Sequence, residues 1–290
     1  MWKQWLDEEG FQQLYNNGYY AQFNKEFNIR FIALNTQVCD NLNFFLIFNN
    51  TDPNAQIEFL YQQLNLAEQN KQKVIIFGHI PIGDNTCSSQ WALRYQVLID
   101  RFEYIIIGQF FGHTHNDHIE SIISSQGEKR SIGSIFIAPS GTTYSFLNPS
   151  YRIFEFKNQK LFNYYQYRLD LDNANQNIHK EPTWDLAYDF LSEYQLDDIS
   201  NDSLYLLAFD KLVNNDNLLN KYILNFNSGN RNLMPKKIDT KVRRNFLCQA
   251  QNIIFDDRFK CFGIYGIFYY KLEFIYQFLQ TLQGEWLIQN

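Results

Sequence analysis

Short apolar runs alternate with segments of helical spacing through the first 163 residues of the chain. The runs predict strands, which we expect at 19–20, 30–34, 74–77, 104–107, 119–123, 134–138 and 152–156. Between them, 54–69 and 91–100 have the apolar spacing of helices. This order favours sheets packed together with helices outside, which places the chain in the α/β (α+β) fold class.

The pattern becomes helical after residue 168. Residues 184–194 follow Pro182-Thr183, which is typical of a helix start, and 203–213 have apolar residues at helical spacing. We therefore predict a first domain over 1–168 and a helical subdomain over 169–261. The tail, 262–290, is rich in aromatic residues on more than one helical face. A buried hairpin or helix, a membrane-interface element and a mistranslated non-coding end all fit it, and its role stays open.

Composition and charge narrow the class of protein. The 290 residues are 45% hydrophobic and carry a formal net charge of -6, which disfavours nucleic-acid binding. The basic pairs Lys236-Lys237 and Arg243-Arg244 are isolated and form no basic stripe. The amino-terminal residues lack the apolar core of a signal peptide, and no apolar run is long enough to cross a bilayer. The sequence indicates no oligomeric state.

Three histidines follow the ends of predicted strands. His113 and His115 stand in Gln109-Phe-Phe-Gly-His-Thr-His-Asn-Asp117, after the apolar stretch 104–107, and His79 follows the buried strand predicted over 73–78. If strand alternation continues to the exit, both imidazoles of the pair point the same way. Because the ends of such strands meet at one rim of a sheet, the three imidazoles predict a metal site. We expect His118, in the charged loop after the pair, and His179, in a polar segment, to be structural or surface residues.

The four cysteines are even in number and lack Cys-x-x-Cys spacing, which argues against zinc ribbons and redox motifs. Cys39 and Cys87 both follow predicted strands and lie in loops on the same rim. Cys248 and Cys261 are separated by a short loop. Free buried thiols are the alternative to disulfides. Asn49 and Asn201 begin Asn-x-Ser/Thr triplets, which are glycosylation acceptors or chance occurrences in an Asn-rich chain.

The motifs resemble the acid sphingomyelinase branch of the calcineurin-like metallophosphoesterases. The histidine motifs are Gly78-His-Ile-Pro-Ile-Gly83 and Gln109-Phe-Phe-Gly-His-Thr-His-Asn-Asp117. Further similar segments are Ile32-Ala-Leu-Asn35 with Cys39, Asn50-Thr-Asp-Pro53, Ala138-Pro-Ser-Gly-Thr-Thr-Tyr144, Asn148-Pro-Ser-Tyr-Arg152, Pro182-Thr-Trp184 and Ser203-Leu-Tyr205. The resemblance continues to Cys261, and residues 262–290 do not resemble the family.

The resemblance implies a metallophosphoesterase-like β-sandwich flanked by helices, with a helical carboxyl-terminal subdomain. It also implies a zinc centre in which His115 belongs to one Zn²⁺ ion and His79 and His113 belong to the other. It pairs Cys39 with Cys87 and Cys248 with Cys261. With the cysteine usage, it implies a secreted or lysosomal glycoprotein hydrolase of lipid metabolism.

Several residues of the family's two-zinc site have no counterpart here. The family also uses Asp-x-His, Gly-Asp-x-x-Asp and Gly-Asn-His motifs, and none of them occurs in this sequence. We therefore expect the carboxyl-terminal part of a metallophosphoesterase domain, incomplete at its amino-terminal side. The aspartate that bridges the metals and the histidine that protonates the leaving group are both missing. No catalytic residue is assigned, and at most one zinc is expected here.

The expected function is that of a zinc-dependent phosphodiesterase that converts sphingomyelin to ceramide and phosphocholine. The expected partner is a phospholipid or another phosphodiester substrate. The Cys39 and Cys87 pair and Gly-His-Ile-Pro are closer to sphingomyelinases than to sphingomyelinase-like nucleotide phosphodiesterases, which are the first alternative. The second alternative is a catalytically inactive fragment or binding protein.

Overall fold

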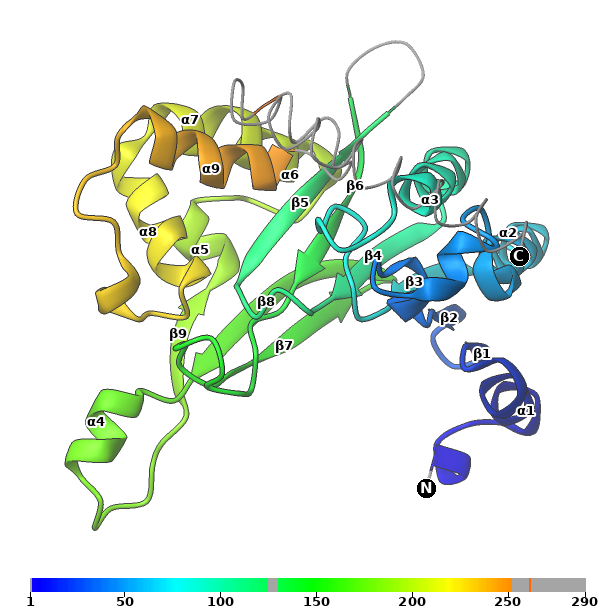
Figure 1. Ribbon diagram of the computed structural model, residues 1–290, viewed down its shortest axis with the longest axis horizontal. Helices are drawn as coiled ribbons and strands as arrows, with labels where there is room; N and C mark the ends of the chain where they lie inside the picture. The colour runs from blue at the N-terminus through cyan, green and yellow to red at the C-terminus, as the bar shows by residue number, and fades with distance from the viewer. Residues whose placement is uncertain (1, 125–129, 252–260, 262–290) are drawn as a thin grey trace, which may run out of the picture.

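A mixed six-stranded sheet forms the centre of the molecule. The computed structural model describes residues 2–124, 130–251 and 261. In spatial order the strands are β1 (Tyr20–Asn24), β2 (Ile29–Ala33), β3 (Lys73–Phe77), β4 (Ile106–Phe111), β6 (Ser131–Ile137) and β5 (His118–Ile123). The four inner strands run parallel, and β1 and β5 are antiparallel edges (Figure 1). Val74, Ile75 and Ile76 of β3 are all buried, as expected for an inner parallel strand covered on both faces.

The helices α2 (Gln56–Gln69) and α3 (Ser89–Phe102) pack against each other and against this sheet, and α1 (Glu8–Asn17) packs against the edge strand β1 (Figure 1). Leu60 and Leu64 of α2 and Trp91 of α3 are fully buried in the first hydrophobic core. Leu60 and Leu64 are four residues apart, so one face of α2 packs inward. The 3₁₀ turns in this half are Trp2–Gln4, Thr36–Cys39, Phe44–Ile47 and Pro53–Ala55.

A second sheet stacks on the first. Its antiparallel strands are β7 (Ser150–Lys157), β8 (Lys160–Arg168) and β9 (Asp185–Asp189). Aromatic side chains fill the space between the sheets, with the ring centroids of Phe110 and Phe154 4.4 Å apart and those of Phe136 and Tyr164 6.0 Å apart. The short helix α4 (Leu171–Gln176) lies in the connection from β8 to β9 and projects away from the sheets (Figure 1).

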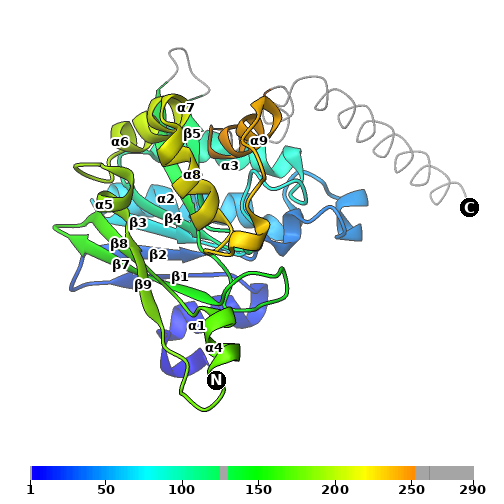
Figure 2. The ribbon, with the colours of Figure 1, turned by 90° about the vertical axis from the view of Figure 1, so that its left-hand side faces the viewer.

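The helices of the carboxyl-terminal half pack against β5 and β6 of the first sheet and β8 and β9 of the second (Figure 2). They are α5 (Phe190–Tyr194), α6 (Asn201–Leu206), a π-helix (Leu207–Lys211), α7 (Leu212–Asn214), α8 (Asp216–Phe226), a 3₁₀ turn (Arg231–Leu233) and α9 (Thr240–Gln251). Leu207 and Leu219 are fully buried in a second hydrophobic core, which also contains Phe136 of β6.

The mixed α/β fold class is confirmed, while several element predictions need correction. The strand expected at 104–107 runs from Ile106 to Phe111, and β8 was not predicted. The helix expected over 184–194 is wrong for its first half, because residues Asp185–Asp189 pair with β8 as β9 and only Phe190–Tyr194 is helical. The helix expected over 203–213 is present as α6, the π-helix and α7.

Two further expectations remain. The domain boundaries at 168 and 261 stay predictions, and the tail 262–290 lies outside the described residues. Within the part of the chain that is described, no helix has the length and apolar character to cross a membrane.

Candidate metal centre

His79 is held at the exit of β3 by close backbone packing. A side chain at Gly78 would place its Cβ 2.8 Å from Thr36 Cγ2 and 2.9 Å from Phe111 Cε1, so only glycine fits. The backbone amide of His79 donates to Thr36 Oγ1 at 3.0 Å, and that of Ile80 donates to the same oxygen at 2.7 Å. The strand end is therefore fixed, and the imidazole projects from an anchored backbone.

His113 lies directly beside His79. Gly112 N donates to the His79 carbonyl at 2.9 Å, which joins the exits of β4 and β3. This brings His113 Nδ1 to 3.3 Å from His79 Nε2, with the rings nearly perpendicular at 82°. The two glycine-histidine motifs thus meet in space, as their positions at strand ends on one rim of a sheet predicted.

His115 contacts residues outside this pair. Both His113 and His115 have left-handed backbone conformations, with φ of 68° and 65°. Strand alternation therefore does not apply to them. The prediction that alternation points both imidazoles the same way is wrong, because neither residue has a strand conformation. His115 Nδ1 lies 2.8 Å from Ser145 Oγ, and its ring meets the edge of Tyr144 at 6.2 Å between centroids. Left-handed backbone at non-glycine residues clusters at functional sites.

The electrostatics of the cluster favour neutral imidazole at His79. Partial burial lowers the pKa of His79, and the nearby imidazoles of His113 and His115 lower it further when they are charged. Neutral imidazole is the form that binds metals.

The His79 and His113 pair fits two corners of a zinc site. Two nitrogens bound to one tetrahedral Zn²⁺ at about 2.0–2.1 Å lie roughly 3.3 Å apart, which is the separation found here. Across the described residues, no group of three or more His, Cys, Asp or Glu side chains is arranged to hold a metal ion. The ligand roles of all three histidines stay predictions.

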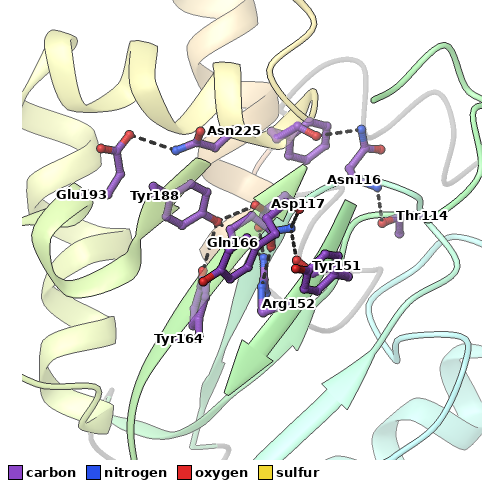
Figure 3. A network of polar contacts seen from close by, with 12 residues as sticks. Thr114, Asn116, Asp117, Tyr151, Arg152, Tyr164, Gln166, Tyr188, Glu193 and Asn225 are labelled. Atoms are coloured by element: carbon purple, nitrogen blue, oxygen red, sulfur yellow. Dashed lines mark hydrogen bonds and ion pairs between the residues drawn. The ribbon is translucent and has the colours of Figure 1, made fainter. Parts of the chain in front are cut away.

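A buried ion pair holds the end of the histidine loop, residues 112–117, which carries His113 and His115 (Figure 3). Arg152 of β7 and Asp117, two residues after His115, form this ion pair with side chains 1% and 4% exposed. Tyr188 of β9 donates to Asp117 Oδ2 at 2.5 Å, and Arg152 Nε donates to Gln166 Oε1 at 2.8 Å. Burial by itself would lower the pKa of Arg152, but the carboxylate of Asp117 raises it overall, so the guanidinium stays charged.

The same loop is tied to the carboxyl-terminal helices. The Asp117 amide and the Asn116 side-chain amide both donate to the Phe226 carbonyl at the end of α8, at 3.2 and 3.1 Å. These contacts and the ion pair were not expected from the sequence. Asp117 follows the histidine motif, but nothing in the sequence pairs it with Arg152.

The remaining predicted residues have clear positions. His118 lies at the start of β5 with only 2% exposure, so its expected loop position is wrong, because the strand begins one residue after Asp117. Its Nε2 is 3.5 Å from Glu120 Oε1. His179 is exposed outside regular structure. Asn49 is exposed in a loop, and Asn201 is exposed as the first residue of α6. Glycosylation of the two asparagines stays a prediction.

Both disulfides that the resemblance implies are present. Cys39 is bonded to Cys87 and Cys248 to Cys261, with Cα atoms 4.8 and 5.7 Å apart. The alternative of free thiols is thereby excluded for all four cysteines.

Comparison with known proteins identifies the family. The profile of the acid sphingomyelin phosphodiesterase C-terminal region matches residues 130–263. The chain is 33% identical over 87% of its length to sphingomyelin phosphodiesterase 2 of Caenorhabditis elegans, of which it covers 41%. It is 37% identical over 72% of its length to a cyclic GMP-AMP phosphodiesterase of Homo sapiens, of which it covers 48%.

The chain therefore belongs to the acid sphingomyelinase-like family, and the match includes the family's carboxyl-terminal region. It spans less than half the length of these relatives. Among solved structures, a chain described as "Structure of PhoD" matches over 52% of this chain at 10% identity with a TM-score of 0.32, a level too low to support an argument about fold.

Proposed function

We propose that this chain carries part of the metal centre of a zinc-dependent, metallophosphoesterase-like phosphodiesterase. The observation that carries the proposal is the placement of His79 Nε2 and His113 Nδ1 3.3 Å apart at the exits of two neighbouring parallel strands. The two stacked sheets with helices outside suit a metallophosphoesterase-like sandwich that is only partly present.

Each histidine has a separate role in this proposal. His79 and His113 would hold one Zn²⁺ between their facing nitrogens, and His115 would contribute to the second. Ser145 keeps the His115 ring in place through its contact with Nδ1. When bound, such a pair of metals supplies an activated hydroxide and stabilises charge on the phosphoryl oxygens.

Sphingomyelin is the first choice of substrate. Relatives named sphingomyelin phosphodiesterase support it, as does the Cys39–Cys87 disulfide, which the resemblance associates with sphingomyelinases. A phosphodiester of a nucleotide is the alternative, supported by the 37% identity to the human cyclic GMP-AMP phosphodiesterase. The two disulfides suit an oxidising compartment, and we propose a secreted or lysosomal location.

An assay of the isolated chain tests whether the three histidines suffice for hydrolysis. We expect purified chain with added Zn²⁺ to hydrolyse neither sphingomyelin nor bis-p-nitrophenyl phosphate above background. Two zinc ions about 3.5–4 Å apart need a bridging anion and further ligands, which three neutral imidazoles do not supply. Zinc-dependent turnover by this chain that disappears in His79→Ala and His113→Ala would show that the three histidines suffice.

A chimaera tests the proposed function itself. In it, this chain replaces the matching 41% of the C. elegans sphingomyelin phosphodiesterase 2, so that the remaining ligands come from that enzyme. We expect Zn²⁺-dependent hydrolysis of sphingomyelin that is lost in His113→Ala and kept in the matched surface control His179→Ala. Preferential cleavage of cyclic GMP-AMP would select the nucleotide alternative. A folded, zinc-loaded chimaera without activity on either substrate would contradict the proposal.

A further inference from the structure

Asp84 and Thr86 form a hydrogen-bonded turn behind His113, on the side away from His79. The Thr86 amide and hydroxyl both donate to Asp84 Oδ1, at 2.8 and 2.7 Å. Thr86 Oγ1 also lies 3.1 Å from His113 Nε2, while Asp84 Oδ1 is 3.8 Å from the same nitrogen. The hydroxyl therefore contacts both the carboxylate and the imidazole.

The number of available protons fixes the direction of these hydrogen bonds. Threonine has one hydroxyl proton, and a carboxylate can only accept. The short, charge-assisted bond to Asp84 uses that proton. Thr86 Oγ1 can then only accept from His113, so the proton of the neutral His113 ring lies on Nε2.

This arrangement leaves a lone pair on His113 Nδ1, the nitrogen that faces His79. Without metal, His79 Nε2 is the donor across the 3.3 Å contact, because His113 Nδ1 has no proton to give. With metal, both facing nitrogens must present lone pairs, so the proton of His79 moves to its own Nδ1. His113 needs no such change and is already in its ligand form.

We propose that Asp84 and Thr86 are positioning residues that hold His113 in the Nε2–H tautomer and so prepare its Nδ1 for a divalent metal. This inference rests on the proposed function only for the identity of the ligand. A metal-binding histidine is usually fixed by a hydrogen bond from its other ring nitrogen, and here a hydroxyl relays that bond to a carboxylate.

The turn is itself anchored, which makes it a firm support for the ring. Asn41 N donates to the Thr86 carbonyl at 2.7 Å, and Asn41 Nδ2 donates to the Asn85 carbonyl at 3.0 Å. The next residue, Cys87, is joined to Cys39 by a disulfide. Three links therefore hold the 84–87 segment against the 39–41 segment.

Imidazole NMR of the metal-free chain tests the tautomer directly. The spectra are recorded on ¹⁵N-histidine-labelled, unglycosylated protein at about pH 8, above the usual imidazole pKa of about 6.5. We expect the proton of His113 on Nε2, with a protected Nε2–H resonance that is lost in Thr86→Val and retained in Thr86→Ser. Asp84→Ala frees the Thr86 proton, so His113 should shift toward the Nδ1–H form.

Thr51→Val is a matched control. Thr51 makes the same kind of turn, donating to Asn49 Oδ1 from its amide at 3.1 Å and from its hydroxyl at 3.0 Å, in an exposed segment. The Thr51→Val variant should leave the His113 signals unchanged. An Nδ1–H tautomer in the wild-type chain, or a protected Nε2–H signal that survives Thr86→Val, would overturn the inference.

Metal titration separates this inference from the proposed function. With Co²⁺ as the probe and its visible absorption as the readout, we expect Thr86→Val to weaken binding about 10- to 100-fold. Thr86→Ser and Thr51→Val should bind like the wild-type chain. Equal Co²⁺ affinity in Thr86→Val would overturn the positioning role. A folded chimaera with the C. elegans enzyme that binds no Co²⁺ would contradict the proposed metal centre, whereas the NMR result still decides the tautomer.

Discussion

The buried pair of Arg152 and Asp117 is the strongest polar contact behind the histidine loop. Breaking a buried ion pair by removing one partner leaves an uncompensated charge, which costs about 3–5 kcal/mol. We expect Arg152→Leu to lower the free energy of unfolding by that amount, because Asp117 then stays buried without its cation. Urea unfolding followed by circular dichroism measures the loss.

A surface ion pair on the same strand is the control. Lys157 and Glu155 are 2.9 Å apart with side chains 51% and 32% exposed, so Lys157→Leu should change stability by less than about 1 kcal/mol. Equal effects of the two replacements would mean that the buried pair does not anchor the loop.

At the scale of single residues, the sequence predicted the meeting of His79 and His113 but not the orientation of the rings. Each glycine-histidine motif follows a strand, and strand ends meet at a rim. The left-handed backbone of His113 and His115 is set by tertiary contacts, such as the Gly112 bond to His79, which no local pattern encodes. Arg152 read as an ordinary strand residue, because its partner is 35 residues away in the sequence.

At the scale of elements, the Cys39–Cys87 disulfide joins a 3₁₀ turn to the segment that supports His113. It closes a separation of 48 residues, against 13 for Cys248–Cys261. Loop-closure entropy therefore predicts that replacing both cysteines of the first pair with serine costs about 4 kcal/mol, and about 3 kcal/mol for the second pair. Thermal or urea unfolding of the two double variants checks the order.

The first double variant should also affect the imidazole spectrum. Because the disulfide holds the 84–87 segment, Cys39→Ser with Cys87→Ser should weaken the protected His113 Nε2–H resonance, while the second pair of replacements should not. A larger stability loss in the second variant would contradict the entropic argument.

Long periodic helices and buried strands were predictable, whereas β8 and β9 were not. Val74 to Phe77 form an uninterrupted apolar run, so β3 is evident from the sequence. β9 reads Asp-Leu-Ala-Tyr-Asp with an N-cap-like Pro-Thr before it, which imitates a helix start. Pairing with β8 through the backbone overrides that local signal.

At the scale of the whole molecule, the two hydrophobic cores share the same strands. In β6, Ile135 and Ile137 face the first core while Phe136 faces the second, and in β5, Ile122 and Ile119 divide in the same way. Alternation along a strand therefore couples the two cores. Separating the chain at residue 168 would remove α8 and α9 from β5, where Ile119 is 1% exposed.

We predict that the cores unfold together rather than as separate units. Leu219→Ala truncates a side chain that is fully buried in the second core and should cost about 2–5 kcal/mol. Because the cores are coupled, hydrogen exchange should show the same loss of protection in β3, which belongs to the first core. Leu206→Ala, at a side chain that is 44% exposed, is the matched control and should change neither region appreciably. Loss of protection confined to α8 and its neighbours, with β3 unchanged, would instead show that residues 169–261 unfold independently.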